Sequence, residues 1–231
     1  MITGVTSGIG AALAERLLAA DYRVLGVARD RGRAADFEAR GGEIVVADLG
    51  DPTARDAAVA EIEARCEVVD LLVNNAAAIA FAEPLVCPVD EWRSLLEVNL
   101  LAVIHLCQAL VPRLSAEGQV VNISSVSARH LASSSFAPYG LTKAALDRFS
   151  EALRLQLSKQ GIRVATVTPG LVDTPIYDKA EGFGPTEARI RSQLPEWLRA
   201  DDIAEAVLWI AERPARVSVA DLVILPRGQA R

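Results

Sequence analysis

Short, mostly apolar runs alternate along the chain with longer stretches in which apolar residues recur at helical spacing. Strands that are apolar on both faces belong to a parallel sheet covered by helices, so this alternation indicates a doubly wound α/β fold. After a very short first strand, the runs that predict strands are residues 23–28, 43–47, 69–73, 119–123, 163–167 and 221–225.

The stretches between these runs have the apolar stripe of helices packed on a sheet. Ile9, Leu13 and Leu17 recur one helical turn apart and fall on one face. Residues 91–114 and 139–160 form two longer helical patterns rich in small apolar residues. These two helices can pack on a second subunit as well as on their own sheet.

Residues 176–199 break the alternation, because Gly182, Gly184, Pro185 and Pro195 are mixed there with aromatic residues. An ordinary surface excursion is one interpretation. Long irregular segments in compact domains more often carry function, so we expect a mobile substrate lid with apolar contacts.

Length and composition favour one globular domain over residues 1–231. The chain has 231 residues, of which 51% are hydrophobic, enough for a single large core. Its formal net charge of −6 argues against a nucleic-acid surface, which needs clustered Lys and Arg. A small-molecule partner is therefore expected.

Cysteine and histidine usage predicts neither disulfides nor a metal site. Cys66, Cys87 and Cys107 are widely spaced and form no CxxC pair, and the two histidines are isolated. No long apolar run lacks a charge or a turn breaker, and glycines occupy the N-terminal region where a signal peptide would be apolar. We expect a cytoplasmic protein that does not enter a membrane.

A glycine cluster, TGVTSGIG at residues 3–10, lies where the first strand would give way to a helix. Glycines at such a turn let a pyrophosphate approach the free N–H groups of the helix N-terminus. A purely structural tight turn is the alternative interpretation.

The end of the second strand bears on which dinucleotide would bind. Ala28 takes the place of the acidic residue that would hold a bare ribose, and Arg29 follows it, which favours a ribose carrying a 2′-phosphate. Asp30 leaves NAD(H) open as an alternative, because its carboxylate has similar spacing from the glycine turn. We expect NADP(H).

Five motifs occur in one order over the whole chain: TGVTSGIG at 3–10, NNAA at 74–77, NISS at 122–125, YGLTK at 139–143 and PG at 169–170. Together they resemble the short-chain dehydrogenase/reductase (SDR) family. The resemblance implies a Rossmann-like sheet of about seven strands in the order 3-2-1-4-5-6-7 and a homodimer or homotetramer.

The resemblance also implies catalytic roles. Tyr139 would be the general acid in reduction and the base in oxidation, and Ser125 would hydrogen-bond the substrate oxygen. Lys143 would hold the nicotinamide ribose, and Asn99 would support a proton relay. The spacing of Tyr139 and Lys143 agrees, since residues four apart share a helical face, and a nearby ammonium would lower the phenol pKa.

The expected cofactor-binding residues come from the same motifs and their surroundings. The glycine turn would hold the pyrophosphate, Asp48 and Leu49 the adenine, and the segment after the sixth strand the carboxamide side of nicotinamide. The full set is Gly4, Thr6, Ser7, Gly8, Ile9, Gly10, Arg29, Asp48, Leu49, Asn75, Ala76, Tyr139, Lys143, Pro169, Gly170, Val172 and Thr174.

Three features depart from the family pattern. The first strand is nearly missing, so either native residues are absent from the N-terminus or stability comes from elsewhere. Ser125 lies one residue farther from Tyr139 than is usual, and Ser127 one residue nearer; we retain Ser125 because it follows the strand end directly. Ala77 stands where glycine is frequent, and a positive φ there would strain it.

We therefore expect an oxidoreductase that moves a hydride between NADP(H) and a carbonyl or secondary alcohol. His130, in the loop after the fifth strand, is a further candidate for substrate contact. The rival hypothesis is a catalytically silent dinucleotide sensor or scaffold of the same fold. The complete set of Asn99, Ser125, Tyr139 and Lys143 argues against it.

Overall fold

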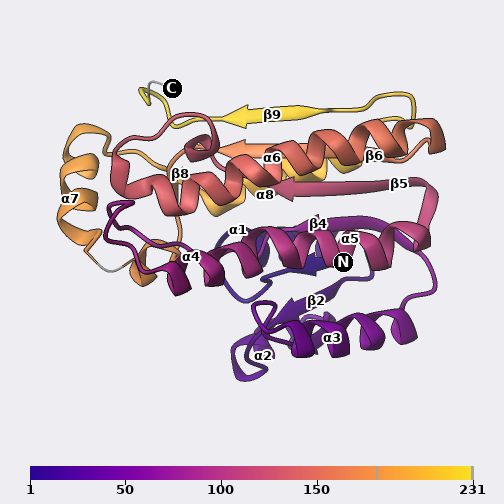
Figure 1. Cartoon of the computed structure of the whole chain (residues 1–231). Coiled ribbons are helices and arrows are strands. Elements are labelled where there is room, and N and C mark those ends of the chain that lie inside the picture. Colours follow the sequence, from indigo (N-terminus) through magenta and orange to yellow (C-terminus); the bar gives the residue numbers. More distant parts are fainter. Residues whose placement is uncertain (181, 230–231) are drawn as a thin grey trace.

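The computed structural model describes residues 1–180 and 182–229 and is built around one parallel sheet (Figure 1). Its strands are β1 (Ile2–Thr3), β2 (Leu25–Ala28), β3 (Glu43–Val46), β4 (Val69–Asn74), β5 (Leu114–Ile123), β6 (Arg163–Pro169) and β9 (Asp221–Ile224). The helices are α1 (Gly8–Ala19), α2 (Ala35–Ala39), α3 (Pro52–Arg65), α4 (Val89–Leu96), α5 (Ala102–Leu110), α6 (Ala137–Leu157), α7 (Gly184–Gln193) and α8 (Ala200–Ala211).

The strand order is β3-β2-β1-β4-β5-β6-β9, and every pairing is parallel. The predicted Rossmann-like order and the number of strands in this sheet are thus confirmed. A separate pair, β7 (Val172–Asp173) with β8 (Leu198–Arg199), was not predicted and joins the two ends of the segment expected to form the lid.

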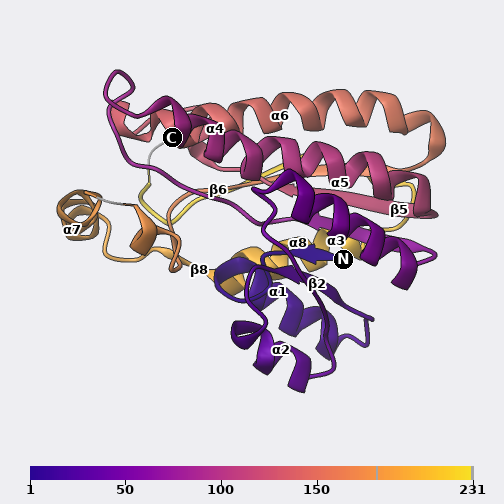
Figure 2. The ribbon, with the colours of Figure 1, turned by 60° about the horizontal axis from the view of Figure 1, so that its bottom comes forward.

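Helices cover both faces of the sheet, as Figure 2 shows. One core cluster joins α1, α2 and α8 to the sheet through residues such as Leu13, Phe37 and Val207. The other joins α3, α5 and α6 through residues such as Ile62, Leu106 and Leu146. The apolar runs are therefore buried from both sides, which is the physical reason for their lack of alternation.

The central strand β1 is as short as the sequence suggests. Ile2 pairs with Gly26 and with Val73, and Thr3 pairs with Val27. Met1 extends the contact with β4, because its amino nitrogen donates to the Leu71 carbonyl over 2.7 Å. Ile2 is fully buried, so even two residues anchor both halves of the sheet.

The long helical pattern at residues 91–114 is interrupted. The π-helical turn Glu97–Leu101 separates α4 from α5, and the chain enters β5 already at Leu114. By length and composition the helical run Val89–Arg113 could cross a membrane. Its inner face, including Leu106 and Leu110, packs instead in the core cluster beneath α3 and α6.

Candidate active site

A cavity of about 590 Å³ opens at the carboxyl ends of the parallel strands. Parallel α/β sheets bind ligands at this edge because the loops and helix N-termini converge there. The predicted site residues lining the cavity are Gly4, Thr6, Ser7, Gly8, Ile9, Arg29, Asp48, Leu49, Asn75, Ala76, Ser125, Tyr139, Lys143, Pro169, Gly170, Val172 and Thr174. Gly10 and Asn99 lie behind this lining rather than in it.

The glycine turn places the start of α1 against the cavity. Gly4 and Gly8 have φ values of +76° and +55°, which L side chains rarely adopt. Ser7 is the extended N-cap, and its side chain makes no capping hydrogen bond with the described residues. The first N–H groups of α1 therefore remain free for an anion, as expected at a helix N-terminus.

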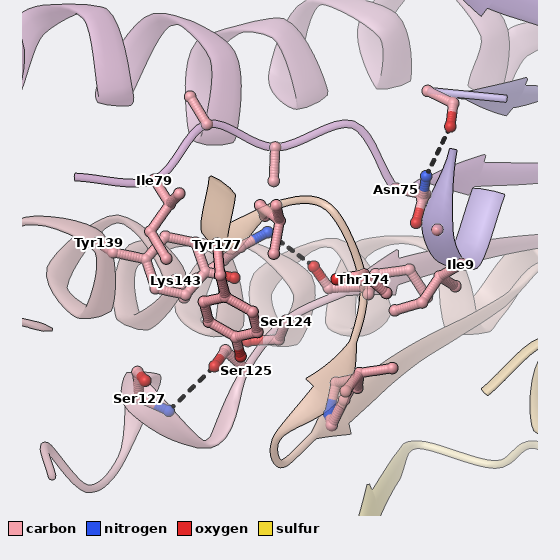
Figure 3. Close-up of a pocket in the computed structure, with 18 of the residues that line it drawn as sticks. Ile9, Asn75, Ile79, Ser124, Ser125, Ser127, Tyr139, Lys143, Thr174 and Tyr177 are labelled. Carbon is pink, nitrogen blue, oxygen red and sulfur yellow. Dashed lines mark hydrogen bonds between the residues drawn. The ribbon is translucent and has the colours of Figure 1, made fainter. Parts of the chain in front are cut away.

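Gly10 allows the helix to approach the loop after β4. A Cβ on Gly10 would lie 2.1 Å from the Gly4 carbonyl oxygen and 2.4 Å from the Asn75 amide nitrogen. The Asn75 side chain itself donates to the Thr3 carbonyl over 2.8 Å and to the Gly4 carbonyl over 3.3 Å (Figure 3), and its backbone N–H donates to the Thr3 hydroxyl over 2.9 Å. Asn75 thus connects β4 to the glycine turn.

Ala77 fits its position without backbone strain. Among the described residues, Asp21 alone combines a side chain with positive φ. The strain considered for Ala77 is therefore absent, and the family's glycine is not required in this backbone.

Arg29 and Asp30 differ in their surroundings. Arg29 is exposed, lines the cavity, and has no ion-pair or hydrogen-bond partner among the described residues. Asp30 does not line the cavity: its carboxylate accepts the Gly32 N–H over 2.8 Å and lies 3.9 Å from Arg33. The cavity end near β2 thus presents the Arg29 guanidinium, while the Asp30 carboxylate binds groups within its own turn.

Tyr139, Ser125 and Lys143 come from two elements and point into the cavity (Figure 3). Tyr139 and Lys143 lie on α6, and Ser125 follows β5. The Lys143 ammonium donates to the Ile123 carbonyl over 2.8 Å and lies 5.7 Å from the centre of the Tyr139 ring. The Ser125 hydroxyl accepts the Ser127 N–H over 3.2 Å, so both candidate serines belong to one turn.

Burial is the largest influence on the pKa values of Tyr139 and Lys143. It raises the pKa of Tyr139 strongly, the nearby Tyr177 adds to this, and a hydrogen bond from Ser125 opposes it. Burial also lowers the pKa of Lys143 to about 8. The lowered Tyr139 pKa expected from helical spacing is therefore not found for the protein alone: burial raises it, and the opposing contact is with Ser125 rather than Lys143.

Asn99 lies in the π-helical turn and is fully buried. Its side-chain oxygen accepts the Ala78 N–H and its amide donates to the Ala78 carbonyl, each over 2.8 Å. Asn99 therefore fixes the loop after β4 from behind and is not part of the cavity wall.

The segment after β6 closes the other side of the cavity. The Gly170 N–H donates to the Ile224 carbonyl over 2.7 Å, and the Leu171 N–H donates to the Gln229 side chain over 3.0 Å. A Cβ on Gly8 would meet Thr174 at 3.2 Å, so this segment reaches the start of α1. Gln229 also lines the cavity; no motif in the sequence indicated it.

Residues 176–199 are more regular than the sequence suggested. They contain the 3-10 turn Tyr177–Lys179 and helix α7, which lies beyond the carboxyl ends of the strands (Figure 1). The ring of Phe183 is 1% exposed and stacks on Tyr177 with centroids 5.0 Å apart. The aromatic residues that broke the pattern thus fasten the segment to the cavity. Whether it moves as a lid remains a prediction.

Comparisons with known proteins agree with this architecture. A family model for the short chain dehydrogenases matches residues 1–182. Serine 3-dehydrogenase from Rhizobium radiobacter is 32% identical over 100% of this chain and 94% of its own length.

Two solved structures share the fold along nearly the whole chain. The closed form of a serine dehydrogenase complexed with NADP⁺ has a TM-score of 0.89 and 27% identity, covering 100% of this chain and 95% of that one. A short chain dehydrogenase from Burkholderia cenocepacia in complex with NADP has a TM-score of 0.85 and 30% identity, covering 97% of this chain and 95% of that one. The chain therefore belongs to the short-chain dehydrogenase family of oxidoreductases.

Proposed function

We propose that the protein transfers a hydride between NADP(H) and a carbonyl or secondary alcohol, with Tyr139 as the general acid or base. The observation that carries the proposal is the shared cavity: Tyr139, Ser125 and Lys143 line the same space as the glycine turn and Arg29. The structural relatives complexed with NADP support the choice of cofactor.

The residues present fit a dinucleotide. Uncapped N–H groups at the start of α1 suit a pyrophosphate, and the absence of a Cβ at Gly10 lets that helix end lie against the loop. At the β2 end, the free guanidinium of Arg29 suits a 2′-phosphate, whereas Asp30 is engaged by Gly32 and Arg33. This favours NADP(H) over NAD(H). Asp48 and Leu49 line the adjoining wall, where adenine would lie.

The nicotinamide supplies the hydride, and the protein supplies the proton. In reduction, the carbonyl carbon gains the hydride, the carbonyl oxygen takes the phenolic proton of Tyr139, and water later restores that proton. A ketone, NADPH and one proton thus give an alcohol and NADP⁺. Burial keeps Tyr139 protonated, which suits the reductive direction.

Ser125 and Lys143 assist Tyr139 by binding the substrate oxygen and the cofactor ribose. The Ser125 hydroxyl lies beside the phenol and can donate to the substrate oxygen as negative charge develops there. Lys143 brings an ammonium to the base of the cavity, anchored on Ile123, where it can hold a ribose hydroxyl and stabilise a phenolate. Asn99 acts as a positioning residue for the loop at Ala78.

The surface of the two long helices bears on how the protein assembles. Leu141 and Leu155 of α6 and Leu101 beside α5 expose apolar side chains on helices that lie side by side (Figure 2). We expect these helices to pair in a homodimer or homotetramer in the cytoplasm. Multi-angle light scattering of the purified protein would give a dimer or tetramer mass, and a monomer at micromolar concentration would contradict the expectation.

The first experiment is NADPH oxidation with a panel of ketones and aldehydes, for the wild type and Tyr139→Phe. The wild type should turn over at least one carbonyl, and loss of the phenolic proton should lower kcat about 10²- to 10⁴-fold. NADPH binding by fluorescence should persist in the variant, because the glycine turn, Arg29 and Lys143 are kept. A Tyr139→Phe protein as active as the wild type would contradict the assigned role.

A further inference from the structure

The part of the cavity wall around Tyr139 is apolar. Tyr139 belongs to a third hydrophobic cluster, separate from the two that flank the sheet. The members of this cluster that also line the cavity are Ile79, Phe136, Tyr139, Ile176, Tyr177 and Ile190. They come from the loop after β4, from the approach to α6 and from residues 176–199, so three separate segments present aliphatic or aromatic side chains to the same space.

Aromatic packing fixes this wall. The ring of Phe136 meets those of Phe81 and Phe183 edge to face, with centroids 5.1 and 5.7 Å apart. Tyr177 stacks on Phe183 and meets Trp197 edge to face at 5.5 Å. Phe136 is 5% exposed and Ile79 is 8% exposed. Because these rings are closely packed, they cannot change rotamer to make room for polar side chains at this wall.

Two of the arginines near this wall, Arg191 and Arg129, are already paired. Arg191 on α7 donates to Asp173 over 2.7 Å and to Glu187 over 2.9 Å, and its guanidinium lies over Trp197. Arg129, after β5, donates to Asp221 over 2.6 Å. Neither lines the cavity.

Two lysine or arginine side chains line the cavity within the described part of the chain, Arg29 and Lys143. Arg29 lies at the β2 end, with Ala28 and Asp48, and Lys143 is held by Ile123. The other polar side chains that line the cavity beside the apolar wall, Ser127, His130 and Gln193 among them, can hydrogen-bond a ligand but bring no lysine or arginine charge to it.

From this wall we infer that the substrate is an uncharged ketone, or the matching secondary alcohol, with an apolar group beside the reacting carbon. The inference rests on the proposed function and deepens it. A carboxylate beside the reacting carbon would lose its hydration against Ile79, Phe136 and Ile190 without gaining a cation, whereas an alkyl or aryl group would be stabilised there. The inference predicts that serine, for which the Rhizobium radiobacter relative is named and which carries a carboxylate, is a poor substrate of this protein.

A pair of ketones tests the preference for an uncharged, apolar group. Ethyl 3-oxobutanoate and 3-oxobutanoate share the same reacting carbonyl, and the ester replaces the negative charge with an uncharged ethyl ester. With NADPH at pH 7.5, a roughly neutral condition, we expect kcat/KM to be at least about tenfold higher for the ester. Equal values, or a preference for the anion, would overturn the inference.

Two arginine variants on α7 test whether the wall sets the preference. Gln193 is exposed and lines the cavity, while its neighbour Ser192 is exposed and does not. Gln193→Arg should raise the anion-to-ester ratio of kcat/KM about fivefold or more, and Ser192→Arg should leave it unchanged. Equal ratios in the two variants would contradict control by the cavity wall.

A binding readout separates this inference from the proposed chemistry. In the Tyr139→Phe protein loaded with NADPH, a ketone that enters the cavity should change the nicotinamide fluorescence without turnover. Tighter binding of the ester than of the anion supports the substrate class even if the wild type reduces neither, a result that would defeat only the proposed reaction. Tighter binding of the anion would overturn the substrate class whatever the activity.

Discussion

Asn99 and Thr142 join the loop behind the cavity to the helix that carries Tyr139. The Asn99 amide donates to the Thr142 hydroxyl over 2.9 Å, and that hydroxyl donates to the Tyr139 carbonyl over 2.7 Å. Because Asn99 also holds both backbone groups of Ala78, one buried amide connects three segments of the site.

Replacing Asn99 by alanine should therefore lower stability and activity together. The change removes the partners of both half-buried backbone groups of Ala78, and an unsatisfied buried group costs about 1–3 kcal/mol. We expect urea unfolding to show a loss of about 2–4 kcal/mol. Gln108→Ala, an exposed change on α5, is the matched control. An Asn99→Ala protein as stable as this control would contradict the network described here.

Gly10→Ala should weaken dinucleotide binding more than the small size of the added methyl group suggests. The added methyl would lie 2.1 Å from the Gly4 carbonyl oxygen, a backbone atom that cannot move without shifting the glycine turn. Overpacking of this kind costs about 1–3 kcal/mol, and the turn it displaces is the proposed pyrophosphate site. Titration with NADPH should show at least about tenfold weaker binding. Gly184→Ala, whose Cβ would meet nothing within 4 Å, should bind as the wild type does.

The sequence predicted the sheet well because its strands are apolar on both faces, a pattern that depends little on distant residues. It failed where pairing is set by tertiary contacts. The first half of β5, which includes exposed Ala116 and Glu117, gave no strand signal, and the β7–β8 pair forms only because residues 176–199 return to the cavity. The π-helical turn at Asn99 has no local pattern that distinguishes it from α-helix.

The candidate site was predictable where short local motifs carry its residues, and not where distant segments meet. The motifs resembling the family placed Ser125, Tyr139 and Lys143, and the structure brings all three to one cavity. The apolar wall and Gln229 were missed because they meet the site from distant segments. The direction of the Tyr139 pKa was missed because burial, which raises this pKa, cannot be judged from helical spacing.

Arg29→Ala should erase the discrimination between NADPH and NADH. Arg29 lines the cavity and has no ion-pair partner among the described side chains, so its charge is free for the 2′-phosphate. A charge-assisted hydrogen bond contributes about 1.5–3 kcal/mol, equivalent to about 10- to 100-fold in the dissociation constant of NADPH. NADH binding should be unchanged. Arg33→Ala, which removes an exposed arginine near Asp30, is the control. Equal loss for both cofactors would show that Arg29 does not recognise the 2′-phosphate.

Ketone reduction should fall as the pH rises through about 8, because burial lowers the pKa of Lys143 to about 8. The ammonium is present below that pH and is lost above it, together with its support for the developing phenolate and the ribose. Tyr139 adds no descending limb in this range, since burial raises its pKa and it stays protonated. A profile of kcat/KM from pH 6 to pH 10 should therefore be flat at first and descend with a midpoint near 8. Lys143→Arg, whose guanidinium stays charged throughout, should retain less activity but lack this descent. The same descent in both proteins would assign it to another group.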